Sequence, residues 1–149
     1  MEKNFFRIVF VAALIFIFSA GNVFAQTNEN PEVKIDYGNS KIFSRAEMDF
    51  CIDIIKYELK RSGCTLHSVR YAGDKFDSHK NRTYLNSLAK SRGFKKKFRK
   101  CMVFYSDYRS PPDDGKISAW NYDSEYTDWQ WWFGFYKEDG EWKLLTSGY

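Results

Sequence analysis

The spacing of apolar and polar positions predicts an amphipathic helix at the start of the folded region. Ser44 and Glu47 have the spacing of a capping box, in which each side chain bonds the backbone amide of the other residue. Apolar residues then recur at helical spacing, and Gly63 supplies a left-handed stop. We expect the apolar stripe to face the core of its own domain. Its members are Met48, Cys51, Ile52, Ile55 and Leu59.

Shorter patterns predict two strands and a second helix in the middle of the chain. Residues 64–71 are rich in β-branched and aromatic side chains, which is typical of a strand. A weaker helical pattern runs from about 78 to 92 and is followed by Gly93. Residues 98–108 alternate as a strand does, but both faces are apolar, so this strand should lie centrally in its sheet.

The last third of the chain predicts a loop, a short strand and a hairpin. The sequence Ser-Pro-Pro-Asp-Asp-Gly at 110–115 cannot continue a strand ladder and indicates an exposed loop. A short strand over 116–122 follows it. Residues 129–137 and 141–146 then flank an Asp-Gly turn, which is the strongest short-range signal for a hairpin.

Two registers fit this hairpin. A two-residue Asp-Gly turn would set Glu138 opposite Glu141, whereas a three-residue turn ending on a left-handed glycine sets Lys137 opposite Glu141. We favour the second register because it pairs opposite charges across the strands. It places Trp142 beside Tyr136, whereas the first places Trp142 beside Lys137.

The N-terminal residues have the pattern of a secretory signal peptide. Lys3 and Arg7 precede an apolar run over 8–18, about half the roughly 20 residues that span a bilayer. The small residues near Ala25 predict cleavage after that position. We therefore expect a leader over 1–25, a flexible polar lead-in over 26–40 and a single domain over 41–149, secreted or periplasmic.

The order of helix, strand, helix and several strands predicts an α+β fold, with the helices packed on a curved antiparallel sheet that ends in a long hairpin. The chain resembles the nuclear-transport-factor-like (SnoaL-like) α+β cone superfamily, found in many small exported bacterial proteins, over about residues 44–149. The resemblance rests on the helix-first order, on the terminal hairpin of an aromatic strand, Asp-Gly and Glu-Trp-Lys-Leu, and on four shorter sequence features. These are Gly63-Cys64-Thr65-Leu66, Arg70-Tyr71, the spacing of Tyr126, Trp129 and Trp131, and the Gly148-Tyr149 ending.

The resemblance implies a conical α+β fold. Enzymes of that superfamily hold an Asp, His or Tyr pair inside the cone, and no such pair can be assigned here, so we name no catalytic residue. We expect a non-enzymatic binding or interaction module for a small ligand, a glycan or a protein. The alternative is a small enzyme of the same fold that uses His67 or Asp107 with Tyr105 or Tyr108.

Aromatic residues make up 19% of the chain and crowd toward its C-terminal end. Strand alternation sets one group of these rings, 129, 131, 133 and 135, on one sheet face and Trp132 with Tyr136 on the other. A face left open would form an apolar pocket or a platform for sugar rings. The candidate ligand-binding residues are Trp132, Tyr136, Trp120 and Tyr126.

The basic stretch 90–100 is the sharpest charge feature. Lys95, Lys96, Lys97 and Arg99 are its candidate surface residues, and they suit contact with an anionic membrane surface or a polyanion. The formal net charge of +4 is too small to indicate nucleic acid. A solvated helix end is the plainer interpretation.

Cysteine and acidic residues add no cofactor or metal site to this expectation. Cys51, Cys64 and Cys101 are compatible with one disulfide and one thiol, or with three reduced thiols, and their spacing is not that of a zinc site. Acidic residues in the late loops lack the spacing of a calcium loop and are expected to be solvated. They are Asp107, Asp113, Asp114, Asp123, Glu125 and Asp128.

Overall fold

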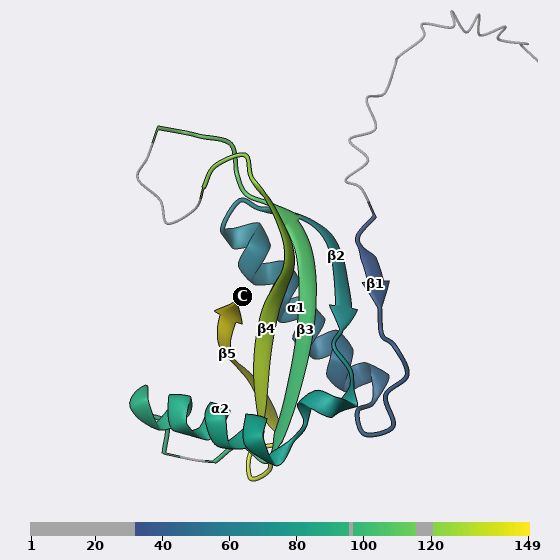
Figure 1. Ribbon diagram of the computed structural model, residues 1–149, viewed down its shortest axis with the longest axis vertical. Coiled ribbons are helices and arrows are strands. Elements are labelled where there is room, and N and C mark those ends of the chain that lie inside the picture. Colours follow the sequence, from purple (N-terminus) through teal and green to yellow (C-terminus); the bar gives the residue numbers. More distant parts are fainter. Residues whose placement is uncertain (1–31, 96, 116–120) are drawn as a thin grey trace, which may run out of the picture.

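The computed structural model describes residues 32–95, 97–115 and 121–149. They form a five-stranded sheet in the order β1-β2-β3-β4-β5, with α1 against one face and α2 across one end of the other (Figure 1). This confirms the α+β class. The elements are β1 (Lys34–Asp36), α1 (Arg45–Arg61), β2 (Thr65–Tyr71), the 3-10 turn η1 (Asp74–Phe76), α2 (His79–Ser91), β3 (Lys100–Arg109), β4 (Glu125–Tyr136) and β5 (Glu141–Gly148).

The leader expected over 1–25 lies outside the described residues. Within the described ranges, no helix combines the length and apolar content that crossing a membrane requires.

Helix α1 begins and ends as the sequence predicts. The Glu47 amide donates to Ser44 Oγ at 3.2 Å, and the Ser44 amide donates to Glu47 Oε2 at 2.8 Å, which completes the capping box. The five apolar residues of the expected stripe are the buried residues of the helix. Gly63 follows with a φ of +74°, a left-handed conformation that glycine adopts without strain.

The sheet is mixed, which corrects the expectation of an antiparallel sheet. Strand β1 pairs in parallel with β2, and Ile35 lies opposite Val69. Its three residues fall within the segment 26–40, where we expected a flexible lead-in. The parallel pairing follows from connectivity, because a helix such as α1 between two strands brings the chain back in the same direction.

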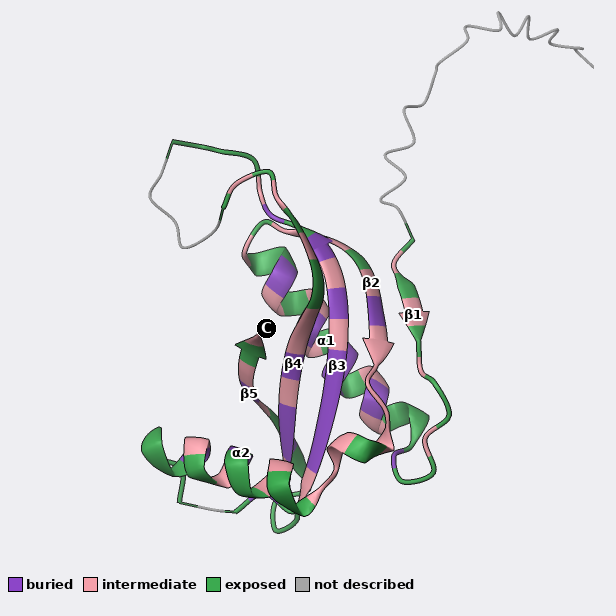
Figure 2. Cartoon of the chain, in the orientation of Figure 1, coloured by how far each residue is buried: buried purple, intermediate pink, exposed green. Residues whose placement is uncertain are grey.

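Helix α1 packs on one face of the sheet and α2 on one end of the other face, and β3 lies in the middle of the strand order as expected. Figure 2 shows β3 buried along most of its length. Side chains of β3, β4 and β5 alternate between two clusters, one under α1 and one under α2. The α1-face cluster includes Met102, Phe104, Tyr108, Trp131, Phe133 and Trp142, and the α2-face cluster includes Leu85, Ala89, Phe98, Cys101, Val103, Tyr136 and Leu145.

The β4–β5 hairpin has neither of the two expected registers. Tyr136 lies opposite Glu141 and Phe135 opposite Trp142, so the turn contains four residues, 137–140. Gly140 does have the expected left-handed backbone, with a φ of +67°. This register places Trp142 in the α1-face cluster, 5% exposed. Burial of an indole contributes more than a pair of exposed charges, which is why charge was the wrong criterion.

The segment before β4 differs in part from expectation. Of the short strand predicted over 116–122, residues 116–120 lie outside the described residues, and residues 121–122 form loop and turn. Strand β4 begins at Glu125, four residues earlier than the predicted start at 129.

All three cysteines are free. Cys51 belongs to the α1-face cluster and Cys101 to the α2-face cluster, so the sheet separates them. Burial raises the pKa of the Cys101 thiol to about 12 and also raises the pKa of Cys51 and Cys64. At neutral pH the three thiols are therefore protonated and weakly nucleophilic.

Gly134 in β4 permits the close packing of the α2-face cluster. The Phe98 ring lies over this glycine and stacks on Tyr136 with centroids 4.1 Å apart. A Cβ atom at position 134 would lie well inside van der Waals distance of the ring. Since Phe98 is buried between this glycine and Tyr136, a Cβ atom at position 134 would displace the ring from its packing.

We expect Gly134→Ala to lower the free energy of unfolding by about 2 kcal/mol or more, because it overpacks a close-packed site. Urea unfolding followed by tryptophan fluorescence measures the change. Gly140→Ala is the matched control: it has open space but a left-handed backbone, and should cost about 1–2 kcal/mol. A stability for Gly134→Ala within about 0.5 kcal/mol of wild type would contradict this packing.

Asp74 ties the segment before α1 to the end of β2. Its carboxylate accepts from Ser40 Oγ at 2.6 Å, from the Lys41 amide at 2.9 Å and from Tyr71 Oη at 2.8 Å. Partial burial raises the pKa of Asp74, but these hydrogen bonds outweigh it and hold the pKa below its usual range. The charged form is therefore stabilised by folding.

Asp74→Asn should lower the free energy of unfolding at neutral pH by about 1–2 kcal/mol. A lowered pKa in the folded state stabilises the protein above the ordinary pKa of Asp, and this contribution is lost as pH falls below about 4. The difference between wild type and variant should thus shrink in acid, as measured by urea unfolding across pH. Asp53→Asn, on the exposed side of α1, is the control; a pH-independent difference for Asp74→Asn would refute the linkage.

Candidate functional site

Helix α2 covers only one end of its sheet face, and the other end carries half-exposed polar and aromatic side chains. The register brings them together, because Arg70 lies opposite Tyr105, which lies opposite Gln130. Ser68 lies opposite Asp107 one step further along. We call this surface the open patch. Its residues are Ser68, Arg70, Tyr105, Asp107, Asp128, Gln130 and Trp132.

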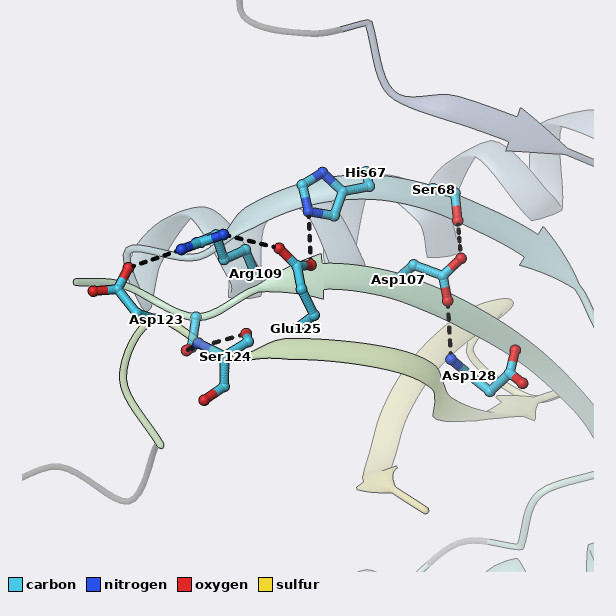
Figure 3. Close-up of polar contacts among 9 residues, drawn as sticks. His67, Ser68, Asp107, Arg109, Asp123, Ser124, Glu125 and Asp128 are labelled. Carbon is cyan, nitrogen blue, oxygen red and sulfur yellow. Dashed lines mark hydrogen bonds and ion pairs between the residues drawn. The ribbon is translucent and has the colours of Figure 1, made fainter. Parts of the chain in front are cut away.

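Two strand irregularities flank Asp107. The β2–β3 register shifts between Leu66 and Ser68, and the β3–β4 register shifts where Asp128 adopts a φ of +56°. The Asp107 carboxylate joins the two sites: Ser68 Oγ donates to one oxygen at 2.7 Å and the Asp128 amide donates to the other at 2.9 Å (Figure 3). Bulges and left-handed non-glycine residues concentrate at functional sites, so both features favour this surface.

Arg70 lies at the centre of the open patch. Its guanidinium forms an ion pair with Asp128 and lies 4.2 Å from the ring centroid of Tyr105. The Arg70 side chain is 43% exposed and that of Asp128 is 64% exposed. The pair therefore remains accessible to a ligand while its opposite charges largely cancel.

Aromatic rings form the side of the open patch nearest α2. Trp132 packs edge-on against Phe76 and Tyr84, with centroids 5.7 and 5.9 Å away. Phe76 also meets Tyr105, at 6.2 Å. The Trp132 indole nitrogen donates to Gln130 Oε1 at 3.0 Å, which fixes the amide beside the ring. An amide, a guanidinium and several aromatic rings thus share one surface.

A second polar row continues the same sheet face toward the strand ends. His67 Nε2 lies 3.1 Å from Glu125 Oε2, and Arg109 contacts both Glu125 and Asp123 at 3.3 Å (Figure 3). Each of these side chains is at least 40% exposed. Exposed pairs of this kind contribute little to stability.

The structure does not bring the four candidate ligand-binding residues together. Trp132 lies in the open patch. Tyr136 is buried beneath α2, and Tyr126 stacks on Tyr108 in the α1-face cluster with centroids 5.1 Å apart. Trp120 lies outside the described residues.

The residues considered for catalysis are divided between the two sheet faces, with Tyr108 on the α1 face and Tyr105 and Asp107 in the open patch. Tyr108 belongs to the α1-face cluster, whereas Asp107 lies on the opposite sheet face, so the two do not form a pair. Tyr105 lies beneath the Arg70 guanidinium. His67 has Glu125 as its hydrogen-bond partner, on the exposed surface.

The acidic residues of the late loops are engaged by cations or by the backbone. Asp123 and Glu125 contact Arg109, and Asp128 contacts Arg70. Asp113 accepts from the Gly115 amide at 2.9 Å. Within the part of the chain that the structure describes, no three His, Cys, Asp or Glu side chains are grouped as a metal site requires.

The basic stretch lies on the far side of α2 from the open patch. Lys95, Lys97 and Arg99 are exposed, and Lys96 lies outside the described residues. Lys100 reaches Glu47 at 3.4 Å, and Arg92 donates to the Leu145 carbonyl.

Sequence reasoning missed the polar members of the open patch. Arg70 and Gln130 fall on the same sheet face as the candidate Trp132 by simple strand alternation, so that pattern could have found them. Asp107 and Asp128 could not have been grouped this way, because the register shifts beside them change which residues lie opposite one another.

Comparison of the chain with known protein families, with curated proteins and with solved structures finds no match.

Asp107 should be the most sensitive carboxylate of this region. Asp107→Asn replaces one acceptor oxygen by an NH₂ group. This group would face either the Ser68 hydroxyl or the Asp128 amide, which are both donors. We therefore expect a loss of about 1–3 kcal/mol in the free energy of unfolding. Asp123→Asn, which removes only an exposed charge, should change it by less than about 0.5 kcal/mol. Equal effects in urea unfolding would contradict the linking role of Asp107.

Proposed function

We propose that the protein is an exported, non-enzymatic binding module of the nuclear-transport-factor-like cone type, and that its open patch binds a polyhydroxylated ligand such as a glycan. The observation that carries this proposal is the Arg70–Tyr105–Gln130–Trp132 arrangement on an uncovered part of the sheet. Helices on a curved sheet and the signal-peptide pattern of 1–25 support the cone and the export.

The side chains of the open patch match the chemistry of sugars. Sugar hydroxyls both donate and accept, and the patch offers a guanidinium donor, carboxylate acceptors and an amide that does both. Half-exposed rings such as Trp132 and Tyr105 can contact the apolar C–H face of a sugar ring. Asp128 offsets the charge of Arg70, and Asp107 adds a further carboxylate, so the open patch offers no net positive charge to an anion and favours a neutral ligand.

The alternative function is that of a small enzyme. The observation in its favour is the 3.1 Å approach of His67 to Glu125, which resembles an acid–base pair. Both side chains are 40% or more exposed, and Arg109 shares the same carboxylate. Water and a competing cation around the pair favour binding over catalysis as the role of this face.

Binding to an array of neutral oligosaccharides and to insoluble neutral polysaccharides tests the proposal. We expect at least one neutral glycan to bind, and Arg70→Ala and Gln130→Ala each to weaken it about tenfold, since each removes a hydrogen-bonding group worth about 1.4 kcal/mol. Both residues are partly exposed, so their variants should remain folded.

Arg61→Ala is the matched control for Arg70→Ala, because it also removes a partly exposed arginine from an ion pair, here with Glu58 of α1. It should leave glycan binding unchanged. The proposal fails if no neutral glycan binds the wild-type protein, or if Arg61→Ala weakens binding as much as Arg70→Ala does.

A further inference from the structure

Positive charge is concentrated in one segment of this chain. Residues 78–100 contain nine lysines and arginines and no aspartate or glutamate. Since the whole chain carries +4 and this segment +9, the remaining residues carry −5. In the structure the segment is α2 together with the chain that turns back along it toward β3 (Figure 1).

Few of these cations are used in internal contacts. Arg82 donates to the Asp77 carboxylate at 2.8 Å, Lys100 pairs with Glu47, and Arg92 donates to the Leu145 carbonyl. Lys96 lies outside the described residues; the remaining five are exposed, and none of these five forms an ion pair with another described residue. They are Lys80, Lys90, Lys95, Lys97 and Arg99.

A groove of about 410 Å³ lies between α2 and the returning chain. Asn86 fixes its width, because its side-chain amide accepts from the Phe98 amide at 2.7 Å and donates to the Phe98 carbonyl at 3.1 Å. Arg82 lies on the α2 wall and Arg99 on the wall of the returning chain, and none of the described residues that line the groove is an aspartate or a glutamate. The lining residues are His79, Arg82, Thr83, Asn86, Phe98 and Arg99.

We propose that this groove binds a phosphate group, carried either by a free phosphate ester or by the headgroup of an anionic lipid. A phosphate presents several acceptor oxygens at once, which the guanidinium groups of the two lining arginines, Arg82 and Arg99, can engage together. Arg82 holds Asp77 through one nitrogen only, Nη1, so its other N–H donors remain available. This site lies on the opposite side of α2 from the open patch and does not depend on the function proposed for that patch.

Two probes distinguish the sources of the phosphate group. Glycerol 3-phosphate, titrated by calorimetry, tests a free ester. Vesicles of equal parts phosphatidylcholine and phosphatidylglycerol, pelleted by sedimentation, test a lipid headgroup, with pure phosphatidylcholine vesicles as the blank.

The variants are Arg99→Gln and His79→Gln in the groove. Lys60→Gln on α1, on the opposite sheet face, is the control because it removes the same charge as Arg99→Gln.

We expect at least one probe to bind the wild-type protein, Arg99→Gln to weaken that binding about tenfold, and Lys60→Gln to change it by less than about twofold. Binding of glycerol 3-phosphate assigns the free ester, and binding of the anionic vesicles alone assigns the lipid headgroup. The proposal is overturned if neither probe binds, or if Lys60→Gln weakens binding as much as Arg99→Gln. Because the Arg99 side chain is exposed and forms no ion pair with a described residue, its variant should keep the wild-type melting temperature. We expect His79→Gln to weaken probe binding independently.

Discussion

The packing of Phe98 over Gly134 determines how the second face of the sheet is divided. The ring lies on the bare backbone of β4, stacks on Tyr136 and is joined to α2 through Asn86. Helix α2 is thereby held over one end of the sheet, and the other end of that face is left without a helix. A side chain at position 134 would push the ring, and α2 with it, away from the sheet.

This division separates three kinds of surface. Buried apolar side chains fill the sheet face under α1. Buried side chains that include Phe98 and Tyr136 fill the end of the other face under α2. The uncovered end holds the open patch, in which Arg70 pairs with Asp128 and Asp107 accepts hydrogen bonds from Ser68 and from the Asp128 amide. The outer side of α2 carries cations that lack such partners among the described residues, so it attracts anions, while the open patch presents hydrogen-bonding groups and rings at little net charge.

Short sequence patterns were sufficient to predict an element whose defining signals lie within the element itself. Helix α1 was predicted with its cap and buried stripe because both signals lie within one helix. Strand β1 was missed because three residues carry no periodic signal and its pairing depends on a crossover. The hairpin register was wrong because burial of Trp142, a tertiary effect, decided it. Gly134 did carry a usable signal, since a glycine inside an aromatic strand indicates close approach of another group.

Hydroxyl-radical footprinting read by mass spectrometry tests most directly the claim that α2 covers one end of the sheet face and leaves the other open. Tyr105, Trp132 and Tyr136 lie on this one face, so they serve as internal standards for one another. We expect labelling of Trp132 and Tyr105, with Tyr136 and Phe98 protected. Labelling of Tyr136 as strong as that of Trp132 would show that α2 does not cover that end of the sheet.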